Sequence, residues 1–513
     1  MSSPEIARAA EGYVLTPYTC HHHPGLDPLR ARWLALRHGF EPRPIERACE
    51  LGFGQGLSLA IHATASEIEW WGTELNPSHV ELTHSLVTDA AARKRLVAAS
   101  FTEFFARDDL PQFDFIALHG VWSWISAANR KAIIEFIDRQ LAADGLMYLS
   151  YNAMPGWSSA LSLRELLVAH ATSPRGAALP LDERIERALE YAVSVAAADP
   201  LWLHALPQAE RHLRDIRHRN SAYLAHEYFN RDWRPWHYAE VAAMLQPIGL
   251  DYVGQSDCSD GYDEWRFSPA QLALLAGCDD LSLRETTRDL LLDRRFRRDI
   301  WCRPTSRNNN AKYQALRIRD VAALQQVPLW HHEQSVTTSV EWPAAVMSLR
   351  EKLSVAGGVA FPGVLLESAD DERALSWLWR AGEISVQQEQ RAQQLCAAAV
   401  RELNARLLTL ALDRGDISAL ASSLSGTGVE LDWIELALLK SALDGQNATE
   451  TLLQVASRAR ALGVAIRDES GEILTGDEEQ LTRLQRRWWQ LVERRDRYQQ
   501  IFALPLDELP ALR

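Results

Sequence analysis

The chain has 513 residues, 47% of them hydrophobic and 24% charged, with a formal net charge of −14 at pH 7. This length and composition predict about two to four globular domains with apolar cores. The acidic balance argues against a general nucleic-acid or anionic-membrane surface, so we expect no nucleic-acid or membrane partner. Six scattered cysteines without a C-x-x-C pair, and a start without a basic-then-apolar leader, favour a cytoplasmic protein with free thiols.

A glycine-rich turn follows the first expected strand, Ile45–Leu51. The residues Glu50–Gly56 read E-L-G-F-G-Q-G, and a helix is expected to begin at Leu57, directly after the third glycine. Glycines without a Cβ let the backbone turn sharply and approach a ligand closely. A second strand over Ile68–Thr73 ends in Glu74. An acid at this position can accept hydrogen bonds from both hydroxyls of a ribose. The pattern therefore predicts a nucleoside site.

The spacing of the glycines indicates which nucleoside the site binds. A dinucleotide fingerprint reads G-x-G-x-x-G because its helix must face a pyrophosphate, whereas this chain reads G-x-G-x-G with Glu50 at the end of the strand. A carboxylate repels a diphosphate but attracts the ammonium group of a methionine moiety. We therefore expect S-adenosylmethionine (SAM) rather than NAD. The expected cofactor-binding residues are Glu50, Gly52, Gly54, Gln55, Gly56, Glu74, Ser100, Phe101 and His119.

Alternating strands and helices continue to about residue 152. A helix is expected over Pro77–Leu86, strands over Leu96–Phe101 and Phe113–Leu118, a helix over Asn129–Ala143 and a fifth strand over Leu146–Tyr151. Strands that alternate with helices predict a parallel sheet with right-handed crossovers. The fold class is therefore α/β, with a Rossmann-like sheet.

About seventy residues of helical sequence then interrupt the sheet before its last strands. We expect a SAM-binding domain over 1–275, with a helical insertion at about 155–240 that forms a lid or a substrate wall. Leu250–Gln255 is an expected strand with Glu264–Phe267 as its partner, and Asp289–Arg303 reads as an arginine-rich helix.

The rest of the chain divides into two further expected units. A middle domain over 276–392 is interpreted as winged-helix-like, and its local acidity favours protein–protein packing over DNA binding. A helical C-terminal domain is expected over 393–513.

Polar and aromatic side chains follow the fourth and fifth expected strands, in His119–Trp124 and Ser150–Trp157. Methyl transfer from a sulfonium requires collinear alignment, so these groups are expected to orient an acceptor. For an amine acceptor, an aromatic pocket lowers the amine pKa while Tyr151 and Asn152 orient the nitrogen. For a hydroxyl acceptor, His119 serves as general base. The sequence leaves both uses open, and the candidate catalytic residues are His119, Trp122, Tyr151 and Asn152.

The chain has two histidine-containing patterns, and neither of them predicts a metal site. Consecutive residues rarely face one ion, so His21–His23 is interpreted as a loop near the cofactor, with Tyr13 and Tyr18 as lid candidates. His226 and Glu227 do not begin an H-E-x-x-H motif, because Asn230 stands at the last position. We expect no metal site.

The chain resembles bacterial class I SAM-dependent methyltransferases that carry a methyltransferase regulatory domain, a group that includes protein-lysine methyltransferases acting on surface proteins. The resemblance implies SAM binding by Glu50, the three glycines and Glu74, with methyl transfer near strands four and five. The chain departs from the family at Glu74, which is usually Asp, and at Ser100–Phe101, where an acid commonly contacts adenine. The matching segments are Glu50–Gly56, His119–Trp124, Ser150–Trp157, Tyr223–Tyr228, Asp293–Cys302 and Leu420–Glu430.

These observations predict an enzyme that transfers a methyl group from SAM to a nucleophile. Lysine side chains of a protein are the leading acceptor, because about 240 residues beyond the catalytic fold suit a macromolecule. The alternatives are O- or N-methylation of a small molecule or glycan, and a non-catalytic SAM-binding regulator or scaffold. The C-terminal domains are expected to engage the substrate or to form a homodimer.

Overall fold

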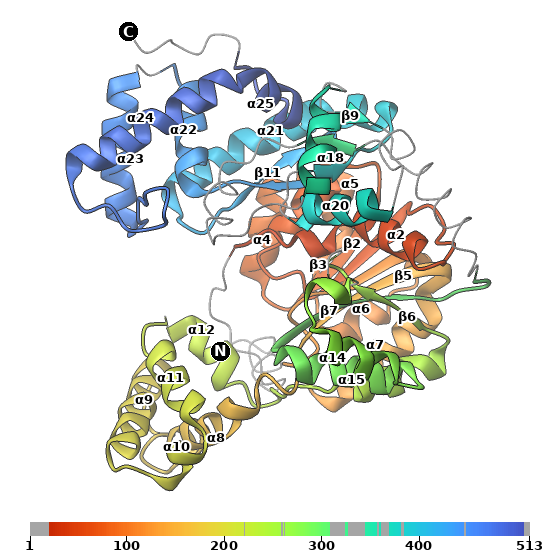
Figure 1. The fold of residues 1–513 in the computed structure, drawn as a ribbon, viewed down its shortest axis with the longest axis vertical. Helices are drawn as coiled ribbons and strands as arrows, with labels where there is room; N and C mark the ends of the chain where they lie inside the picture. The colour runs from red at the N-terminus through yellow and green to blue at the C-terminus, as the bar shows by residue number, and fades with distance from the viewer. Residues whose placement is uncertain are drawn as a thin grey trace.

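A seven-stranded sheet in the order β3-β2-β1-β4-β5-β7-β6 lies at the centre of the structure (Figure 1). The first five strands are parallel, whereas β7 runs antiparallel to both β5 and β6. This arrangement confirms the expected α/β sheet. The strands are β1 (Arg47–Leu51), β2 (Glu69–Glu74), β3 (Leu96–Ala98), β4 (Phe113–Leu118), β5 (Leu141–Asn152), β6 (Asp251–Gln255) and β7 (Phe296–Cys302).

The computed structural model describes residues 20–219, 221–257, 260, 262–307, 324–326, 344–355, 359–360, 369–380, 384–445 and 448–506. The lid candidates Tyr13 and Tyr18 lie outside these residues. Of the helices that are described, none is long and apolar enough to cross a membrane.

Strand alternation gives the sheet two apolar faces. Ala48 of β1 packs into the core on one face, with helices α2 to α5, while Cys49 and Leu51 pack into the core on the other, with α6, α7 and α13. A parallel sheet needs both faces covered, which explains the nearly continuous apolar strands. These helices are α2 (Pro28–Arg37), α3 (Leu57–Ala65), α4 (Pro77–Leu86), α5 (Ala90–Arg95), α6 (Phe101–Phe105), α7 (Ala127–Gln140) and α13 (Tyr238–Leu245).

Two expected boundaries shift for local reasons. The third strand ends at Ala98, because Ser100 forms a capping box with Glu103 and starts α6. The helix expected to reach Ala143 ends at Gln140, and β5 begins at Leu141 with an irregular register against β4.

The expected arginine-rich helix over Asp289–Arg303 is wrong. Its first part ends α15 (Leu281–Leu292), and its second part is β7. Glu264–Phe267 is not the partner of β6 either: it begins in a 3-10 helix, η4 (Asp263–Trp265), and β6 pairs with β7. The sheet therefore extends past residue 275, the expected end of the first domain.

Two of the three charges of β7 are buried and paired, whereas Arg298 is exposed. Arg297 and Asp299 are both fully buried, and the guanidinium of Arg297 donates to Asp299 at 3.0 Å and to both oxygens of Asp289 at 2.8 Å. Each buried charge thus has a hydrogen-bonded counter-ion, which buried ion pairs require. Ion pairing allows a strand of this composition to lie inside the sheet.

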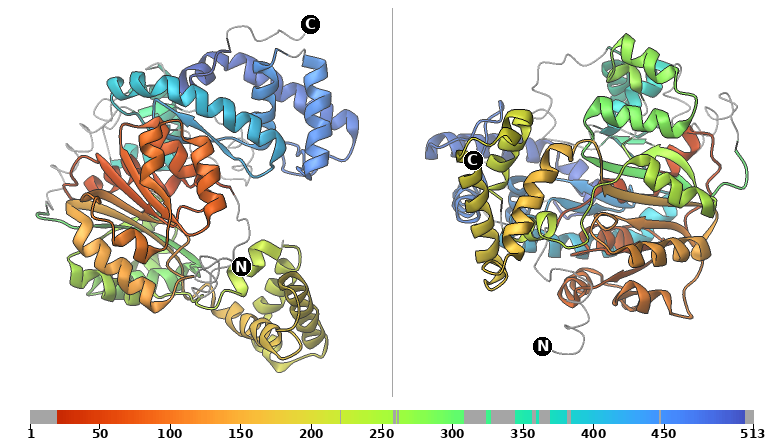
Figure 2. Two further views of the ribbon diagram at one scale, coloured as in Figure 1. Left: turned by 180° about the vertical axis from the view of Figure 1, so that it is seen from behind. Right: turned by 90° about the horizontal axis from the view of Figure 1, so that it is seen from below.

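The expected helical insertion forms a cluster with its own core, beside the sheet domain in every view (Figures 1 and 2). It follows β5, so it begins where the carboxyl ends of the parallel strands lie. Its helices are α8 (Ser158–Thr172), α9 (Leu181–Ala197), α10 (Leu201–Ala205), α11 (Pro207–Ile216) and α12 (Ser221–Tyr228).

In the middle part of the chain, the structure describes two helices and a three-stranded sheet in the order β10-β8-β9. The expected strand near 384–386 is present, and the winged-helix-like interpretation stays a prediction. The elements are β8 (Leu324–Gln326), α18 (Ala344–Val355), β9 (Val359–Ala360), α20 (Ala369–Arg380) and β10 (Ile384–Val386), while α14 (Pro269–Ala276) comes earlier, before α15.

The C-terminal part is helical, as expected, with one added hairpin formed by β11 and β12. Helix α21 and this hairpin pack directly on α3, the helix that follows the glycine loop. The elements are α21 (Gln390–Asp413), β11 (Ala419–Ser422), β12 (Thr427–Glu430), α22 (Trp433–Leu443), α23 (Ala448–Leu462), α24 (Asp477–Glu493) and α25 (Arg495–Phe502).

Candidate active site

A cavity of about 570 Å³ lies at the carboxyl ends of the parallel strands. Its volume falls within the range of small-molecule and cofactor sites, and its position is where open α/β sheets bind ligands. The glycine loop and Glu74 line one end, and α11 and α12 of the insertion line the other. Every residue expected to bind the cofactor lines this cavity, as does Asn152.

The glycine loop, Glu50–Gly56, uses left-handed backbone at Gly52, Gly54 and Gly56, with φ of 73°, 58° and 70°. A Cβ on Gly56 would lie 2.0 Å from Oγ1 of Thr83 on α4, whereas a Cβ on Gly54 would meet no atom within 4 Å. Gly56 therefore permits close packing of the loop on α4, while Gly54 leaves open space beside the loop.

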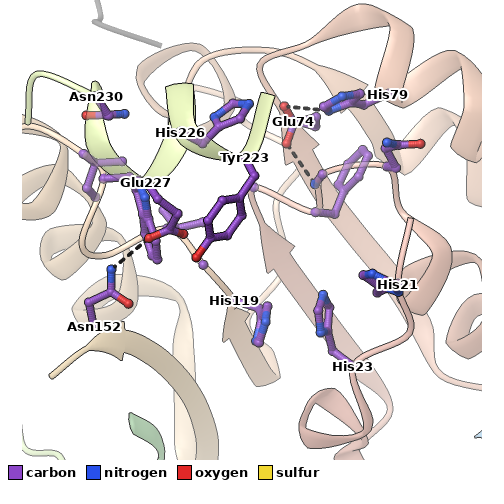
Figure 3. A pocket seen from close by; sticks show the side chains of 18 of the residues that line it. His21, His23, Glu74, His79, His119, Asn152, Tyr223, His226, Glu227 and Asn230 are labelled. Atoms are coloured by element: carbon purple, nitrogen blue, oxygen red, sulfur yellow. Dashed lines mark hydrogen bonds and ion pairs between the residues drawn. The ribbon is translucent and has the colours of Figure 1, made fainter. Parts of the chain in front are cut away.

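Glu74 joins the end of β2 to the glycine loop (Figure 3). Its Oε2 accepts a hydrogen bond from the backbone N–H of Gly54 at 2.9 Å, and its Oε1 accepts one from the N–H of Asn76 at 2.9 Å. The glutamate side chain is one methylene longer than the aspartate typical of the resembled family, and it spans the distance to the loop.

Glu50 is buried at the same end of the cavity, and its Oε2 has no hydrogen-bond partner among the described residues. Burial, and then the neighbouring Glu74, raise the pKa of Glu50 to about 8. An unpartnered carboxyl beside the loop fits the ammonium group of an amino-acid ligand, because such a cation would replace the missing partner.

Ser100 and Phe101 lie at the third strand's end. The backbone N–H of Ser100 donates to Glu103, and the Phe101 ring stacks on Phe105 at 5.9 Å between centroids. Phe101 therefore brings an aromatic side chain to the part of the cavity where the family commonly has an acid.

His119 lines the cavity after β4. Its Nδ1 lies 2.8 Å from the hydroxyl of Tyr148, and its ring stacks on His23 at 3.8 Å between centroids (Figure 3). Burial lowers the pKa of His119 well below its ordinary value, and the nearby His23 and Arg298 add to this. The imidazole is therefore neutral at physiological pH.

The structure places Trp122 and Tyr151 away from the cavity, against the expectation that they face the acceptor. Both are fully buried; Trp122 packs near Trp236, and the Tyr151 hydroxyl donates to Asp299 at 2.7 Å. Successive strand residues point to opposite faces, so Asn152 reaches the cavity and Tyr151 enters the core.

At the insertion end of the cavity, Glu227 of α12 meets Asn152 of β5. The Asn152 amide Nδ2 donates to Oε2 of Glu227 at 3.4 Å, and Tyr223 lies beside them (Figure 3). Burial raises the pKa of Glu227 to about 7. Glu227 is not among the site residues predicted from the sequence, although it lies four residues after Tyr223 and hence on the same helical face.

The histidine tract lies beside the cavity, as the loop interpretation expects. His21 and His23 line the cavity, while His22 is buried against Gly428 of β12. Within the described residues, no group of three or more His, Cys, Asp or Glu side chains is arranged to hold a metal ion.

Comparisons with known proteins extend these observations. A family model described as a predicted methyltransferase regulatory domain matches residues 220–303, a segment that includes α12 and β7. An uncharacterized protein of Synechocystis sp. is 29% identical over 474 residues, which are 87% of this chain and 90% of that protein. An uncharacterized protein of Rickettsia prowazekii is 24% identical over 56% of this chain and 52% of its own length.

One solved structure shares the fold over nearly the whole chain. The structure of PKMT2 from Rickettsia typhi in complex with AdoHcy matches with a TM-score of 0.62 at 15% identity, over 95% of this chain and 100% of that chain. The chain therefore shares the fold of that protein, and the cavity lies at the carboxyl ends of the parallel strands of this fold. The match of residues 220–303 to a methyltransferase regulatory domain agrees with the resemblance found in the sequence.

Proposed function

We propose that this protein is a class I SAM-dependent methyltransferase that transfers the methyl group of SAM to the side-chain nitrogen of lysine residues in a protein. The observation that carries the proposal is the buried carboxyl of Glu227, which lies across the cavity from Glu74 and accepts a hydrogen bond from Asn152 (Figure 3). A carboxylate and an amide at the acceptor end suit a cationic, hydrogen-bonding acceptor.

The loop end of the cavity is assigned to SAM, which supplies an electrophilic methyl group when bound. Glu50 pairs with the ammonium group, and Glu74 accepts hydrogen bonds from the ribose hydroxyls. The glycine loop brings its backbone close to the ligand. Phe101 offers a ring to the adenine, in place of the acidic contact common in the family.

Lysine must lose a proton before its nitrogen attacks a methyl group. Lowering the lysine pKa from about 10.4 to neutrality costs about 4–5 kcal/mol. Glu227 is suited to take this proton, since its pKa of about 7 places a partly ionised carboxylate at the acceptor end at neutral pH. One proton moves from the ammonium to Glu227. The freed lone pair of the lysine nitrogen would then form the new nitrogen–carbon bond as the sulfur–methyl bond of SAM breaks, with its electron pair left on the sulfur of S-adenosylhomocysteine.

The surroundings of Glu227 favour the neutral form of an amine. Trp157, Tyr223 and Tyr228 line this end of the cavity, and the guanidinium of Arg295 lies 4.6 Å above the Trp157 ring. Partial desolvation by aromatic rings and a nearby cation both lower an amine pKa. The rings also stabilise a methylated ammonium product through cation–π contact.

Hydroxyl methylation finds less support in the same cavity. The candidate base for that reaction, His119, has its pKa held well below its ordinary value by burial, so it accepts a proton poorly near pH 7. An amine acceptor needs no proton transfer to His119.

The architecture of the acceptor end supports a macromolecular substrate. Helices α11 and α12, which line it, belong to an insertion beside the sheet rather than to the sheet domain itself (Figure 1).

The proposal is tested with methyl-labelled SAM and a lysate of the host from which this gene has been deleted. We expect labelled proteins that contain methyl-lysine, with the label abolished by Gly54→Arg and strongly reduced by Glu227→Gln. Glu190→Gln, a change on the exposed face of α9, is the matched control and should label like the wild type. Label found only in small molecules, or no label at all, would contradict the proposal.

A further inference from the structure

Between its glycines the loop carries two side chains, Phe53 and Gln55, and they are anchored on different bodies: the sheet domain and the C-terminal body, residues 387–506. Phe53 is buried against Gly72 of β2, where a Cβ would lie 2.9 Å from its ring. Gln55 is also buried, and its Oε1 accepts a hydrogen bond from Nη2 of Arg414 at 2.8 Å. Arg414 directly follows α21, so the C-terminal part of the chain contacts the loop itself.

Arg414 is held in place by a second residue of the same segment. Its Nε and Nη2 donate to the two carboxylate oxygens of Asp416, at 2.8 and 2.7 Å. This two-point pairing fixes the plane of the guanidinium and leaves Nη2 directed at Gln55 as well. The side chains of Arg414 and Asp416 are 29% and 27% exposed, so solvent weakens the pair only in part.

Asp416 also contacts a second chain segment that lines the cavity. Its Oδ2 accepts a hydrogen bond from the backbone N–H of Cys20 at 2.9 Å. Cys20 lines the cavity and precedes His21 and His23, which line it too. The Arg414–Asp416 pair therefore connects two chain segments that enclose the same end of the cavity.

Further contacts join the two bodies beside this pair. Nε2 of His62 on α3 lies 3.0 Å from Oγ1 of Thr427, and the Gln388 side chain donates to the carbonyl of Ala65 at 2.7 Å. The hairpin thus secures α3, while Arg414 secures the loop that precedes it.

A loop with three glycines loses much conformational entropy when it becomes ordered. A tether that orders the loop before the ligand arrives reduces this cost at the moment of binding. We propose that Arg414 and Asp416 are positioning residues that hold the glycine loop through Gln55, so that the C-terminal body forms part of the cofactor site. This inference rests on the proposed binding of SAM by the loop.

The test is calorimetric titration of the full chain with S-adenosylhomocysteine. A hydrogen bond from a charged donor, discounted for partial exposure, predicts that Arg414→Ala weakens binding about tenfold. Asp416→Asn should have a smaller effect in the same direction, and Arg414→Lys should restore part of the affinity. The control Arg458→Ala removes another arginine of the C-terminal body, one that donates to the carbonyl of Leu412, and should bind like the wild type.

A double-mutant cycle separates positioning from general destabilisation. If Arg414 acts through Gln55, then Gln55→Ala combined with Arg414→Ala binds no more weakly than Gln55→Ala alone. Strictly additive losses would overturn the inference, and so would wild-type affinity in Arg414→Ala. Either result leaves the proposed function standing as long as the wild type binds the ligand. A wild type that does not bind S-adenosylhomocysteine would overturn the proposed function and this inference together.

Discussion

The carboxylate of Glu74 accepts a hydrogen bond from the backbone N–H of Gly54, with 2.9 Å between Oε2 and the amide nitrogen. This contact links the end of β2 to the loop after β1, so two of the residues assigned to one nucleoside position each other. Each carboxylate oxygen keeps further lone pairs for ribose hydroxyls, because an ionised carboxylate accepts about four hydrogen bonds.

Glu74→Gln should weaken the binding of S-adenosylhomocysteine about 10- to 100-fold, since hydrogen bonds to a charged acceptor contribute about 1.5–3 kcal/mol. The amide also presents a donor where the loop N–H already donates. Calorimetric titration measures the change. Glu81→Gln, at an exposed position of α4, is the control with unchanged affinity, and equal affinities in the two variants would refute the role of Glu74.

Glu50 should make cofactor binding pH-dependent. Its pKa of about 8 means that it carries a proton below that pH. Pairing with an ammonium requires the carboxylate, so binding releases the proton and affinity rises with pH up to about 8, by up to about tenfold per unit. Titrations with S-adenosylhomocysteine at about pH 6, 7 and 8 measure this slope. Glu50→Gln should flatten it, and a slope that persists in the variant would assign the effect to another group.

Glu227→Gln should lower methyl transfer to the labelled protein about 100- to 10,000-fold, the usual contribution of a general base. Affinity for S-adenosylhomocysteine should not change, because Glu227 lies at the acceptor end. The wild-type rate should rise with pH through about 7, as the carboxyl loses its proton, and this limb should vanish in the variant. Methyl-transfer rates measured across pH on one purified acceptor protein test both predictions. Undiminished turnover in Glu227→Gln would exclude Glu227 as the base.

Gly56→Ala should lower both stability and cofactor affinity. The residue combines a φ of 70° with a Cβ position 2.0 Å from Thr83. Gly445 is a matched control, because it has the same φ of 70° but open space at the Cβ position. Gly445→Ala should cost only about 1–2 kcal/mol for the left-handed backbone. Denaturant unfolding should show a larger loss for Gly56→Ala, and equal losses would mean that the Thr83 contact has no effect.

Arg297→Met should destabilise the fold by about 3–5 kcal/mol, because it leaves buried carboxylates without their partner. The affected groups, Asp289 and Asp299, both hydrogen-bond to Arg297. Arg187→Met breaks an exposed pair with Glu190 and should change stability by less than about 1 kcal/mol. Unfolding free energies from denaturant titration compare the two variants. A similarly small change in unfolding free energy in both variants would show that the buried ion pairs of Arg297 do not stabilise the fold.

The cofactor end was predictable from sequence because its determinants are local. A strand, three glycines, a helix, a second strand and Glu74 lie within twenty-five residues of Glu50. Each of these features is predicted from residue spacing and backbone conformation alone.

The strand β7 was not predictable in the same way. The sequence pattern predicts its arginines as part of an arginine-rich helix, whereas Arg297 lies on a strand, is buried and pairs with Asp289 on a different element. Only the folded chain brings these charges together. The alternation of β5 explains the error at Tyr151, because the sequence does not state which face of a strand meets the cavity.

The acceptor end depends on contacts across long stretches of sequence. Asn152 and Glu227 are 75 residues apart, and Gln55 and Arg414 are 359 apart. Helical spacing places Glu227 on the same face as Tyr223, but no local pattern indicates that this face closes a cavity over β5. Such residues are found only once the insertion and the C-terminal body are placed.

The most direct test of this account is calorimetric titration of the purified chain with S-adenosylhomocysteine, beside a Gly54→Arg variant. The account predicts a one-to-one complex with affinity on the order of micromolar for the wild type, in the range of typical enzyme ligands. It predicts no binding to Gly54→Arg, whose side chain would enter the open space beside the loop. Absence of binding by the folded wild type, or equal binding by the variant, would contradict the assignment of this cavity to SAM.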